Sequence, residues 1–543
     1  MPSTEASASP TPVQQDTGAD VEQQTLLQQQ ASSSDVAFEV DISDSNTKQH
    51  SPVDERVVLR KLDVHLVCPF LLLIVLCYID RTNLAFAALE LNADLGFTDS
   101  IYGRGSGVFF VGYMIFQIPS NLILVRIGAR KWLAAIIVAW GLVAICFATL
   151  RNPVQFYILR FLLGAAESGT LPGMWYHLTG FYSKDEMSVA WSWMMVGIAV
   201  SQVVGGPLAA GLLALDGVLG LDGWQWLFIL EGVPTVLMGL YIFMTLTESA
   251  LQATFLTPAE RNWLFQRQAR QAASLEEAGA QSTSRQALVN FRVWYGSVMM
   301  LLGAIPKYSL LYWLPLIVKS LLVGPPLPAD THHDGDAMEV EPADHNQLVA
   351  LLCALPFAVS AISIYFTAQH SKKTGERKLH VAVPWAVGAV CLLSLAVTMG
   401  RNDIAAFATI SCATVVWAGD AVMASWPATY LSGPAAATAA ALINSIGSIG
   451  GVVGPILIGE LKEKTGNYIA AMGVLAGVAA LMAIMAANFP ELPTPVDGTE
   501  VAEAGEQGLE TKALVQWAEA TAATLSDERK WQARANKDSL FSF

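Results

Sequence analysis

Twelve apolar stretches, each long enough to cross a lipid bilayer as a helix, alternate with polar breaks along most of this chain. A helix needs about 20 residues to cross the roughly 30 Å hydrocarbon core. Because lipid offers no hydrogen-bond partners, the backbone of such stretches must bond internally, as a helix does. The sequence therefore predicts an all-α membrane protein with 12 transmembrane helices. The stretches lie at about 62–90, 104–125, 132–150, 154–181, 188–215, 225–247, 293–323, 346–369, 379–399, 403–431, 435–460 and 466–488.

The composition agrees with a membrane protein and argues against other classes. Hydrophobic residues make up 53% of the 543 residues and charged residues only 14%, whereas soluble domains carry about 25% charged residues. All six cysteines fall in apolar stretches without C-x-x-C spacing, so neither a disulfide framework nor a zinc site is indicated. No Ser/His/Asp set or phosphate-binding loop appears. We therefore expect no enzyme, no cofactor and no metal centre.

Lys and Arg cluster in the breaks on one side of the predicted membrane, which places that side in the cytoplasm. An even number of crossings then puts both termini there. We divide the chain into a disordered tail at 1–60, a six-helix bundle at 61–247, a cytoplasmic linker with a surface helix at 248–292, a second bundle at 293–488 and a cytoplasmic tail at 489–543. No targeting signal appears, so the plasma membrane is the default location, with vacuolar or plastid membranes as alternatives.

Three polar segments outside the bundles carry weaker signals. Thr257-Pro258-Ala259-Glu260 is typical of a helix start, because Thr can cap, Pro suits the first turn and Glu can bond back. The C-terminal stretch 509–525 is weakly amphipathic, and both partner binding and simple solvation are open. The outer loop at 324–345 could hold a metal ion, although a solvated acidic loop is the simpler interpretation. Its candidate ligands are His332, His333, Asp334, Asp336, Glu339, Glu341 and His345.

Two short motifs recur in the second half at nearly one offset, which indicates duplicated six-helix units. RIGARKWL begins at Arg126, and KTGERKLH begins at Lys373, 247 residues later. Gly206-Pro207 recurs as Gly454-Pro455 at an offset of 248. Parallel repeats of this kind occur in transporters, where the substrate site lies between the two halves. The glycines also allow close packing and the prolines allow bends, so we assign Gly206, Pro207, Gly454 and Pro455 to gating.

Ionisable residues inside two of the predicted crossings are the main candidates for chemistry. The first crossing contains Asp80 and Arg81, and the fourth contains Arg160 and Glu167. A charge in a bilayer costs roughly 2.5 to 3.5 kcal/mol on insertion scales, so it persists where it meets protein, water or a ligand. Arg160 and Glu167 lie seven residues apart, on nearly the same helix face, and could form a purely structural ion pair. Two acid and base sets in one bundle favour the alternative, a proton relay with an anion site.

The residue chemistry suggests a role for each group. Asp80 and Glu167 are assigned to carry protons, because a dry cavity favours the neutral carboxyl and a nearby guanidinium opposes this. Arg81 and Arg160 keep their charge and can bind a carboxylate through two parallel hydrogen bonds, so they are assigned to the substrate anion or to exchange with the acids. Arg81 is the first choice for substrate contact, whereas Arg160 is expected mainly to tune Glu167.

The second bundle adds Lys307 and Asp420, each inside an apolar stretch. Both could simply face a water-filled vestibule. Alternatively, Lys307 attracts the substrate and Asp420 is a further proton site, and the two could act as a coupled pair. Aromatic residues with polar tips could line the cavity, although single aromatics in membrane helices more often serve packing. These candidates are Tyr113, Tyr308, Tyr312 and Trp426.

The chain resembles the major facilitator superfamily and, within it, the anion:cation symporter family, over about residues 60–488. The resemblance is carried by YIDRTNLAFAA, FFVGYMIFQIPSNLILVRIGARKWL, RFLLGAAESGTLPGMWY and YLSGPAAATAAALINSIGSIGGVVGPILIG. It implies the major facilitator fold and transport of organic anions such as sugar acids, tartrate, phthalate, allantoate or nicotinate, commonly with protons. It also implies that Asp80 and Glu167 couple protons and that the two arginines serve anions and gating. Tyr113 and Asn444 would then help to line the cavity, and Arg126, Gly128 and Arg130 would belong to a cytoplasmic gate.

The chain departs from the family at that gate. Val125 and Lys372 stand where acids are typical, so the gate must be latched differently. The function we expect is proton-coupled symport of a small organic anion by alternating access, in a monomer within the lipid bilayer and without a nucleic-acid partner. A facilitative uniporter or anion exchanger, and a non-transporting sensor with the carrier fold, are the alternatives.

Overall fold

The structure is a computed structural model, and every regular element that it describes is a helix. Three expectations fall wholly or largely outside the described residues: the disordered tail up to residue 52, the acidic loop at 324–345 as far as residue 341, and the amphipathic stretch at 509–525. Residues 342–345 of that loop are helical. The residues described are 53–277, 284–323, 342–431 and 433–490.

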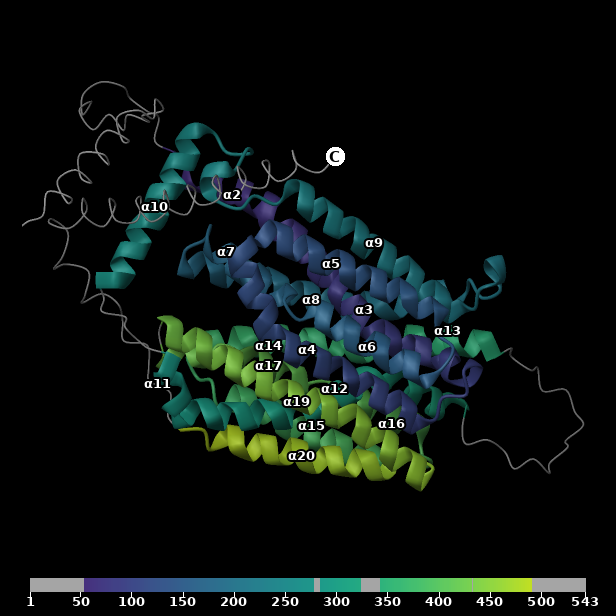
Figure 1. Cartoon of the computed structure of the whole chain (residues 1–543). Coiled ribbons are helices and arrows are strands. Elements are labelled where there is room, and N and C mark those ends of the chain that lie inside the picture. The colour runs from purple at the N-terminus through teal and green to yellow at the C-terminus, as the bar shows by residue number, and fades with distance from the viewer. Residues whose placement is uncertain (1–52, 278–283, 324–341, 432, 491–543) are drawn as a thin grey trace, which may run out of the picture. The chain divides into compact units, whose positions relative to one another are not determined.

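Six crossings form the first half of the chain (Figure 1). The first begins as α2 (Glu55–Leu62) and continues through a π-helical turn (Asp63–Val67) into α3 (Cys68–Asp94). The others are α4 (Asp99–Ile127), α5 (Ala129–Cys146), α6 (Pro153–Glu167) with α7 (Thr170–Thr179), α8 (Lys184–Leu213) and α9 (Gly223–Thr245).

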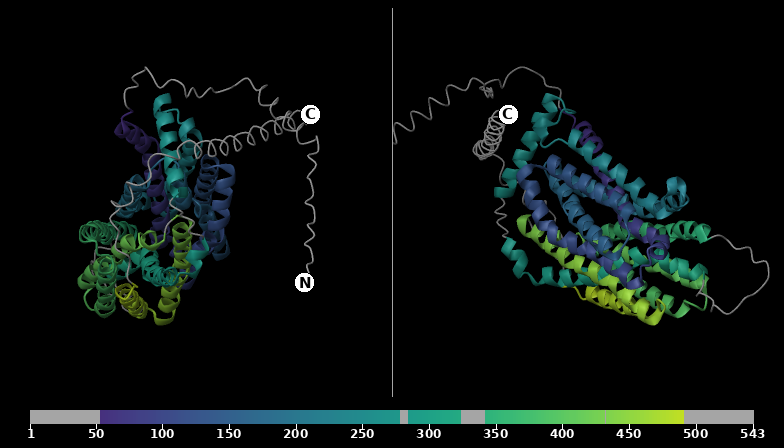
Figure 2. Two further views of the ribbon diagram at one scale, coloured as in Figure 1. Left: turned by 90° about the vertical axis from the view of Figure 1, so that its left-hand side faces the viewer. Right: turned by 45° about the vertical axis from the view of Figure 1, so that its right-hand side comes forward.

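Two helices, α10 (Pro258–Glu277) and α11 (Ser284–Val289), then lead into six further crossings. In both views of Figure 2 the green and yellow crossings of the second half form a group beside the purple and blue ones of the first. The later crossings are α12 (Phe291–Val323), α13 (Pro342–Leu352) with α14 (Ala354–Thr374), α15 (Leu379–Thr398), α16 (Asp403–Ala413) with α17 (Val416–Met423), α19 (Gly433–Thr465) and α20 (Ile469–Ala487), with the short α18 (Pro427–Tyr430) before α19.

The fourth, eighth and tenth crossings are broken helices. Eleven helices of the described part are long and apolar enough to cross a membrane, and the fourth crossing is missing from that number because it is divided between α6 and α7. A Cβ at Gly169, within the break, would lie 1.9 Å from the Ser120 hydroxyl of α4. Pro172 follows and cannot donate a backbone hydrogen bond. The sequence predicts one helix each at 154–181, 346–369 and 403–431, whereas the structure interrupts all three.

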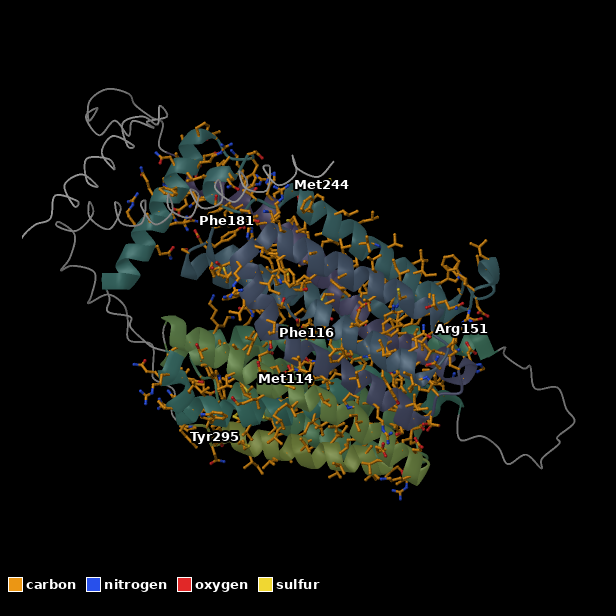
Figure 3. All side chains as sticks on the ribbon, viewed as in Figure 1. Met114, Phe116, Arg151, Phe181, Met244 and Tyr295 are labelled. Atoms are coloured by element: carbon orange, nitrogen blue, oxygen red, sulfur yellow. The ribbon has the colours of Figure 1, made fainter. Side chains whose placement is uncertain are left out.

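Large apolar side chains cover the outside of the helices, as contact with lipid requires. Phe116 on α4 is 41% exposed and Met244 on α9 is 68% exposed (Figure 3). Others of this kind are Leu237, Phe366, Val390 and Ile484. Most charged side chains in the middle of the crossings are buried instead, so their partners must come from neighbouring helices.

The linker helix α10 is attached to one end of the first half. Thr257 and Glu260 bond to each other's backbone N–H groups, at 2.8 and 3.3 Å, so α10 has the capped start expected from its sequence. Glu260 also pairs with Lys61 at 2.8 Å, and Arg267 pairs with Glu186. We call this end of the protein the linker end and the opposite end the far end. Figure 3 labels Phe181 at the linker end of the fourth crossing and Arg151 at its far end.

At the far end, polar contacts join the two halves. Asp99 Oδ1, at the start of α4, lies 2.8 Å from Lys462 Nζ on α19. Ser100 donates its hydroxyl to Glu460 at 2.7 Å, and Arg104 pairs with the same carboxylate at 2.5 Å. The far ends of α4 and α19 are therefore held together by charged groups.

Glycines let α4 and α19 approach closely along much of their length (Figure 1). A Cβ added at Gly103 would lie 2.6 Å from the carbonyl oxygen of Pro455, and one at Gly107 would lie 2.8 Å from that of Val452. Small residues at such crossings are typical of membrane helices that pack backbone to backbone. This contact brings the central residues of the two halves together.

Candidate functional site

Arg81 and Glu167 form a buried ion pair between the first and fourth crossings. Arg81 Nε and Nη2 each lie 2.6 Å from Glu167 Oε1, and the two side chains are 5% and 0% exposed. Cys77, one turn earlier on α3, donates its thiol to the same oxygen at 2.7 Å. Glu167 Oε2 has no hydrogen-bond partner among the described residues. The carboxylate is therefore bound through one oxygen, and that oxygen occupies the guanidinium.

Aromatic rings surround the guanidinium of Arg81. Its Cζ lies 5.0 Å from the ring centre of Tyr78, 5.4 Å from that of Tyr113 and 5.6 Å from that of Phe109. Ring faces attract a cation and exclude water from it. The structure thus places Tyr113, one of the cavity candidates, directly beside Arg81.

Arg160 connects the two halves and does not contact Glu167. It is 1% exposed and donates to the Gly105 carbonyl at 3.3 Å and to the Tyr312 hydroxyl of α12 at 3.0 Å. The ring of Phe109 lies 4.8 Å from Arg160 Cζ and 5.6 Å from Arg81 Cζ, so both arginines contact one aromatic ring. The sequence assigns Arg160 mainly to tune Glu167, but the arginine in direct contact with that acid is Arg81.

A glycine contact between α4 and α6 permits this arrangement. A Cβ at Gly164 would lie 1.9 Å from the carbonyl oxygen of Phe109, and one at Gly112 would lie 2.2 Å from that of Phe161. The two backbones therefore touch midway along the crossing. Any larger side chain at Gly164 would push Phe109 away from both arginines.

Asp80 is hydrogen-bonded inside the first bundle and makes no ion pair with an arginine among the described residues. Its Oδ2 accepts a hydrogen bond from Trp140 Nε1 of α5 at 3.1 Å. Glu231 on α9 is 7% exposed, lies within electrostatic range of Asp80 and has an Oε2 without a partner in the described structure. Sequence reasoning missed Glu231. The signal was present, because Glu231 is an acid well inside the stretch 225–247, and the rule that selected Asp80 applies to it equally.

Lys307 and Asp420 form an ion pair in the second half. Lys307 Nζ lies 2.5 Å from Asp420 Oδ2, and the side chains are 11% and 15% exposed. The ring of Tyr308 lies 5.0 Å from the ammonium and 4.4 Å from the ring of Phe110 on α4. The coupled pair considered from the sequence is thus a direct contact.

Two other candidates lie nearer the linker end. Trp426 is buried and its ring packs 4.5 Å from that of Phe489, which follows α20. Asn444 is exposed on α19, next to Ser445, whose hydroxyl donates to Gln117 of α4 at 3.3 Å. Neither of the contacts described for Trp426 and Asn444 involves Arg81, Glu167, Lys307 or Asp420.

Glu248, which follows α9, lies against the loop between α4 and α5, where this chain lacks the acid that is typical of the family. It accepts backbone N–H bonds from Ala129 and Arg130 at 3.1 and 3.0 Å, at the start of α5, where the helix dipole favours negative charge. Gly128, at φ +90°, leaves room for it, since a Cβ there would lie 2.7 Å from the carboxylate. Burial raises the pKa of Glu248, and the two N–H bonds oppose that rise. Arg130 donates its side chain to the Phe243 carbonyl. Arg126, the remaining candidate of this loop, is exposed.

The two glycine-proline pairs lie at tight helix contacts. A Cβ at Gly206 would lie 2.4 Å from the carbonyl oxygen of Ala350 on α13, and one at Gly454 would lie 2.4 Å from that of Ile305 on α12. Each proline follows its glycine inside the same helix, Pro207 in α8 and Pro455 in α19. Their assignment to gating stays a prediction.

Known proteins resemble this chain over most of its length. The family model of the Major Facilitator Superfamily matches residues 70–455. A protein named as a tartrate transporter in Agrobacterium vitis is 35% identical over 438 residues, covering 79% of this chain and 94% of that one. NicT, named as a metabolite transport protein of Pseudomonas putida, is 35% identical over 449 residues, covering 82% and 97%. A quinolone resistance transporter of Acinetobacter baumannii is 32% identical over 418 residues, covering 77% and 91%.

Solved structures show the same fold at much lower identity. The xylose transporter XylE from E. coli has a TM-score of 0.61 at 14% identity, covering 80% of this chain and 97% of that one. A bacterial homologue of the human lysosomal transporter Spinster has a TM-score of 0.57 at 16% identity, covering 78% and 95%. The family match, the transporter relatives and the twelve crossings agree. The chain therefore belongs to the Major Facilitator Superfamily and is a multi-pass membrane transporter, not an enzyme.

Proposed function

We propose that the protein is a secondary active transporter that carries a small organic anion, a carboxylate, together with protons by alternating access. The single observation that supports this most is the Arg81–Glu167 pair, in which an acid occupies the arginine that a substrate carboxylate would need. A substrate anion and the Glu167 carboxylate compete for one guanidinium. Protonation of Glu167 ends that competition, so a proton prepares the site for the anion.

The energetics favour binding of the two together. Leaving one member of a buried ion pair without its partner costs about 3 to 5 kcal/mol. A proton on Glu167 without an anion leaves Arg81 uncompensated, and an anion without the proton places two negative charges beside one cation. The binding free energy of the anion alone, or of the proton alone, therefore carries a penalty that is absent when both bind together. Even 2.8 kcal/mol of this coupling corresponds to about a 100-fold effect on affinity.

Other predicted residues fit around this exchange. Arg160 and Lys307 add positive charge near the halves' contact, and Tyr113 and Tyr308 lie beside Arg81 and Lys307 as hydrogen-bonding surfaces. Asn444 and Trp426 extend the substrate path toward the linker end. Asp80 carries a proton within the first bundle.

We further propose that residues 61–247 and 293–488 move as two bodies joined by the linker 248–292. With both termini cytoplasmic in the plasma membrane, the linker end faces the cytoplasm. The charged contacts at the far end then close the outer side, so this arrangement corresponds to an inward-facing state. The close contacts that join the two halves, between Gly206 and Ala350 and between Gly103 and Pro455, would change during the opposite motion.

The names of the relatives support an anion without deciding which one. The tartrate transporter of Agrobacterium vitis is named for a carboxylate, whereas the Acinetobacter relative is named for quinolone resistance. A thermal-shift screen of purified protein against carboxylates at two pH values would select ligands, because preferential binding stabilises the folded form.

Uptake into proteoliposomes then tests the proposal. We expect the selected carboxylate to accumulate when the outside is acidic and to equilibrate when no pH gradient exists. Substrate-specific uptake that ignores the pH gradient would favour a uniporter or an anion exchanger. Binding without any flux would favour a sensor with the carrier fold.

A further inference from the structure

Each half of the protein places a cation on its first crossing and an acid on its fourth. In the first half these are Arg81 on α3 and Glu167 at the end of α6. In the second half they are Lys307 on α12 and Asp420 on α17. In both halves the fourth crossing is a broken helix: the break follows Glu167 directly in the first half and lies five residues before Asp420 in the second. Each ion pair therefore joins the first and fourth crossings of its own half.

The second pair is built so that it can be opened. Its side chains are 11% and 15% exposed, against 5% and 0% for Arg81 and Glu167. Asp420 Oδ1 is buried and has no hydrogen-bond partner in the described part of the chain, so only Oδ2 holds the lysine. A pair that only fastened α12 to α17 would gain from bonding both oxygens. A free buried oxygen and residual exposure fit a partner that changes.

A group of neighbouring aromatic rings connects the two pairs. Tyr78 lies 5.0 Å from Arg81 Cζ and is within electrostatic range of Lys307 as well. Tyr308, beside Lys307, is linked to the arginines through Phe110 and then Phe109, at ring distances of 4.4 and 5.1 Å. Both cations therefore border the same group of rings, at the contact between the halves.

We propose that the Lys307–Asp420 pair is a second exchangeable anion site, and that the transported substrate is a small dicarboxylate that binds Arg81 with one carboxylate and Lys307 with the other. The proposal rests on the proposed function and adds the substrate class. One carboxylate replaces Glu167 at Arg81, and the other replaces Asp420 at Lys307. Because each cation belongs to a different half, a ligand with two anionic ends would bind both halves at once.

The experiment compares ligands that differ in one carboxylate. L-Tartrate and L-threonate share a carbon skeleton, and threonate has a hydroxymethyl group in place of one carboxylate. Succinate with butyrate and phthalate with benzoate give two further matched pairs. Dissociation constants are measured on purified full-length protein in lipid nanodiscs, at acidic pH, for wild type and for the double variant Lys307→Met/Asp420→Asn. The double variant removes both charges together, so it leaves no unpaired buried charge behind.

We expect wild type to bind at least one dicarboxylate tenfold or more tightly than its matched monocarboxylate. In the double variant this preference should fall below about threefold, while affinity for the monocarboxylate stays within threefold of wild type. Lys319→Met is the matched control. Lys319 lies on the same helix as Lys307, but its ammonium donates to the Leu89 carbonyl and not to Asp420. This variant should keep the dicarboxylate preference.

Two results would overturn the inference. One is a wild type that binds monocarboxylates as tightly as their dicarboxylate partners, and the other is a double variant that keeps the preference and only loses thermal stability, as expected of a structural latch. If monocarboxylates bind and are taken up with protons, the proposed function stands and this inference fails. If no carboxylate of the panel binds, both fail.

Discussion

Replacing Glu167 by Gln should separate anion binding from proton binding. Gln keeps the shape of a protonated Glu but removes the carboxylate that lies 2.6 Å from Arg81. The unpaired charge costs about 3 to 5 kcal/mol, and an incoming anion can recover part of that free energy. Recovery of ~2 kcal/mol predicts that Glu167→Gln binds the anion about 30-fold more tightly than wild type at neutral to alkaline pH.

The assay is a series of dissociation constants measured across pH, combined with transport. In wild type the anion affinity should fall by up to about tenfold per pH unit once Glu167 is ionised, because binding then requires uptake of a proton. In Glu167→Gln the affinity should be nearly independent of pH. Accumulation driven by a pH gradient should be lost, while exchange of internal for external anion should survive.

A matched control separates this effect from a general loss of buried charge. Glu90 lies on α3 and accepts a hydrogen bond from Asn346 at the far end, so Glu90→Gln removes an acid without touching Arg81. It should keep the pH dependence of wild type. A Glu167→Gln protein that still binds in a pH-dependent way, or that accumulates anion against a gradient, would refute the competition between carboxylate and substrate.

Three further predictions concern packing, capping and closure. Gly164→Ala should lower the free energy of unfolding by about 2 kcal/mol or more, and so lower the melting temperature, because its Cβ would lie 1.9 Å from a backbone carbonyl of α4. The control Gly477→Ala, whose Cβ would have nothing within 4 Å, should leave the melting temperature unchanged. Burial raises the pKa of Glu248 in the folded protein, so ionising this carboxyl costs stability. The melting temperature of wild type, relative to that of Glu248→Gln, should therefore fall as the pH rises from about 4 to about 7. A difference that stays constant with pH would contradict this. Asp99→Asn should remove the ion pair with Lys462 at the far end, which contributes about 0.5 to 1 kcal/mol at this partial exposure. The rate at which a thiol reagent labels a cysteine introduced at the far end should then rise about two- to fivefold. An unchanged labelling rate would argue against a closing role.

Much of the fold could be read from the sequence because the membrane imposes it. The apolar stretches had to be helices, and their number and the capped start of α10 follow from local patterns. The breaks in the fourth, eighth and tenth crossings could not be read in this way. The break at Gly169 depends on how closely α4 approaches, which is a property of two helices together.

The site was only partly predictable. Neighbouring residues on a helix point about 100° apart, so Asp80 and Arg81 could not both face one partner. The sequence does not say which of them faces Glu167. Arg160, on the same helix as Glu167, was the nearer candidate in sequence, yet it bonds Tyr312 of the other half.

The sequence by itself determined that this protein crosses a membrane twelve times and that a few ionisable residues lie within it, because lipid allows neither unpaired backbone groups nor stray charges. Only the tertiary structure decided which charges meet: Arg81 with Glu167, Lys307 with Asp420, and Asp80 with Trp140. The physical reason is that a helix defines the direction of its own side chains, whereas their partners depend on the rotation and depth of the helices packed against it.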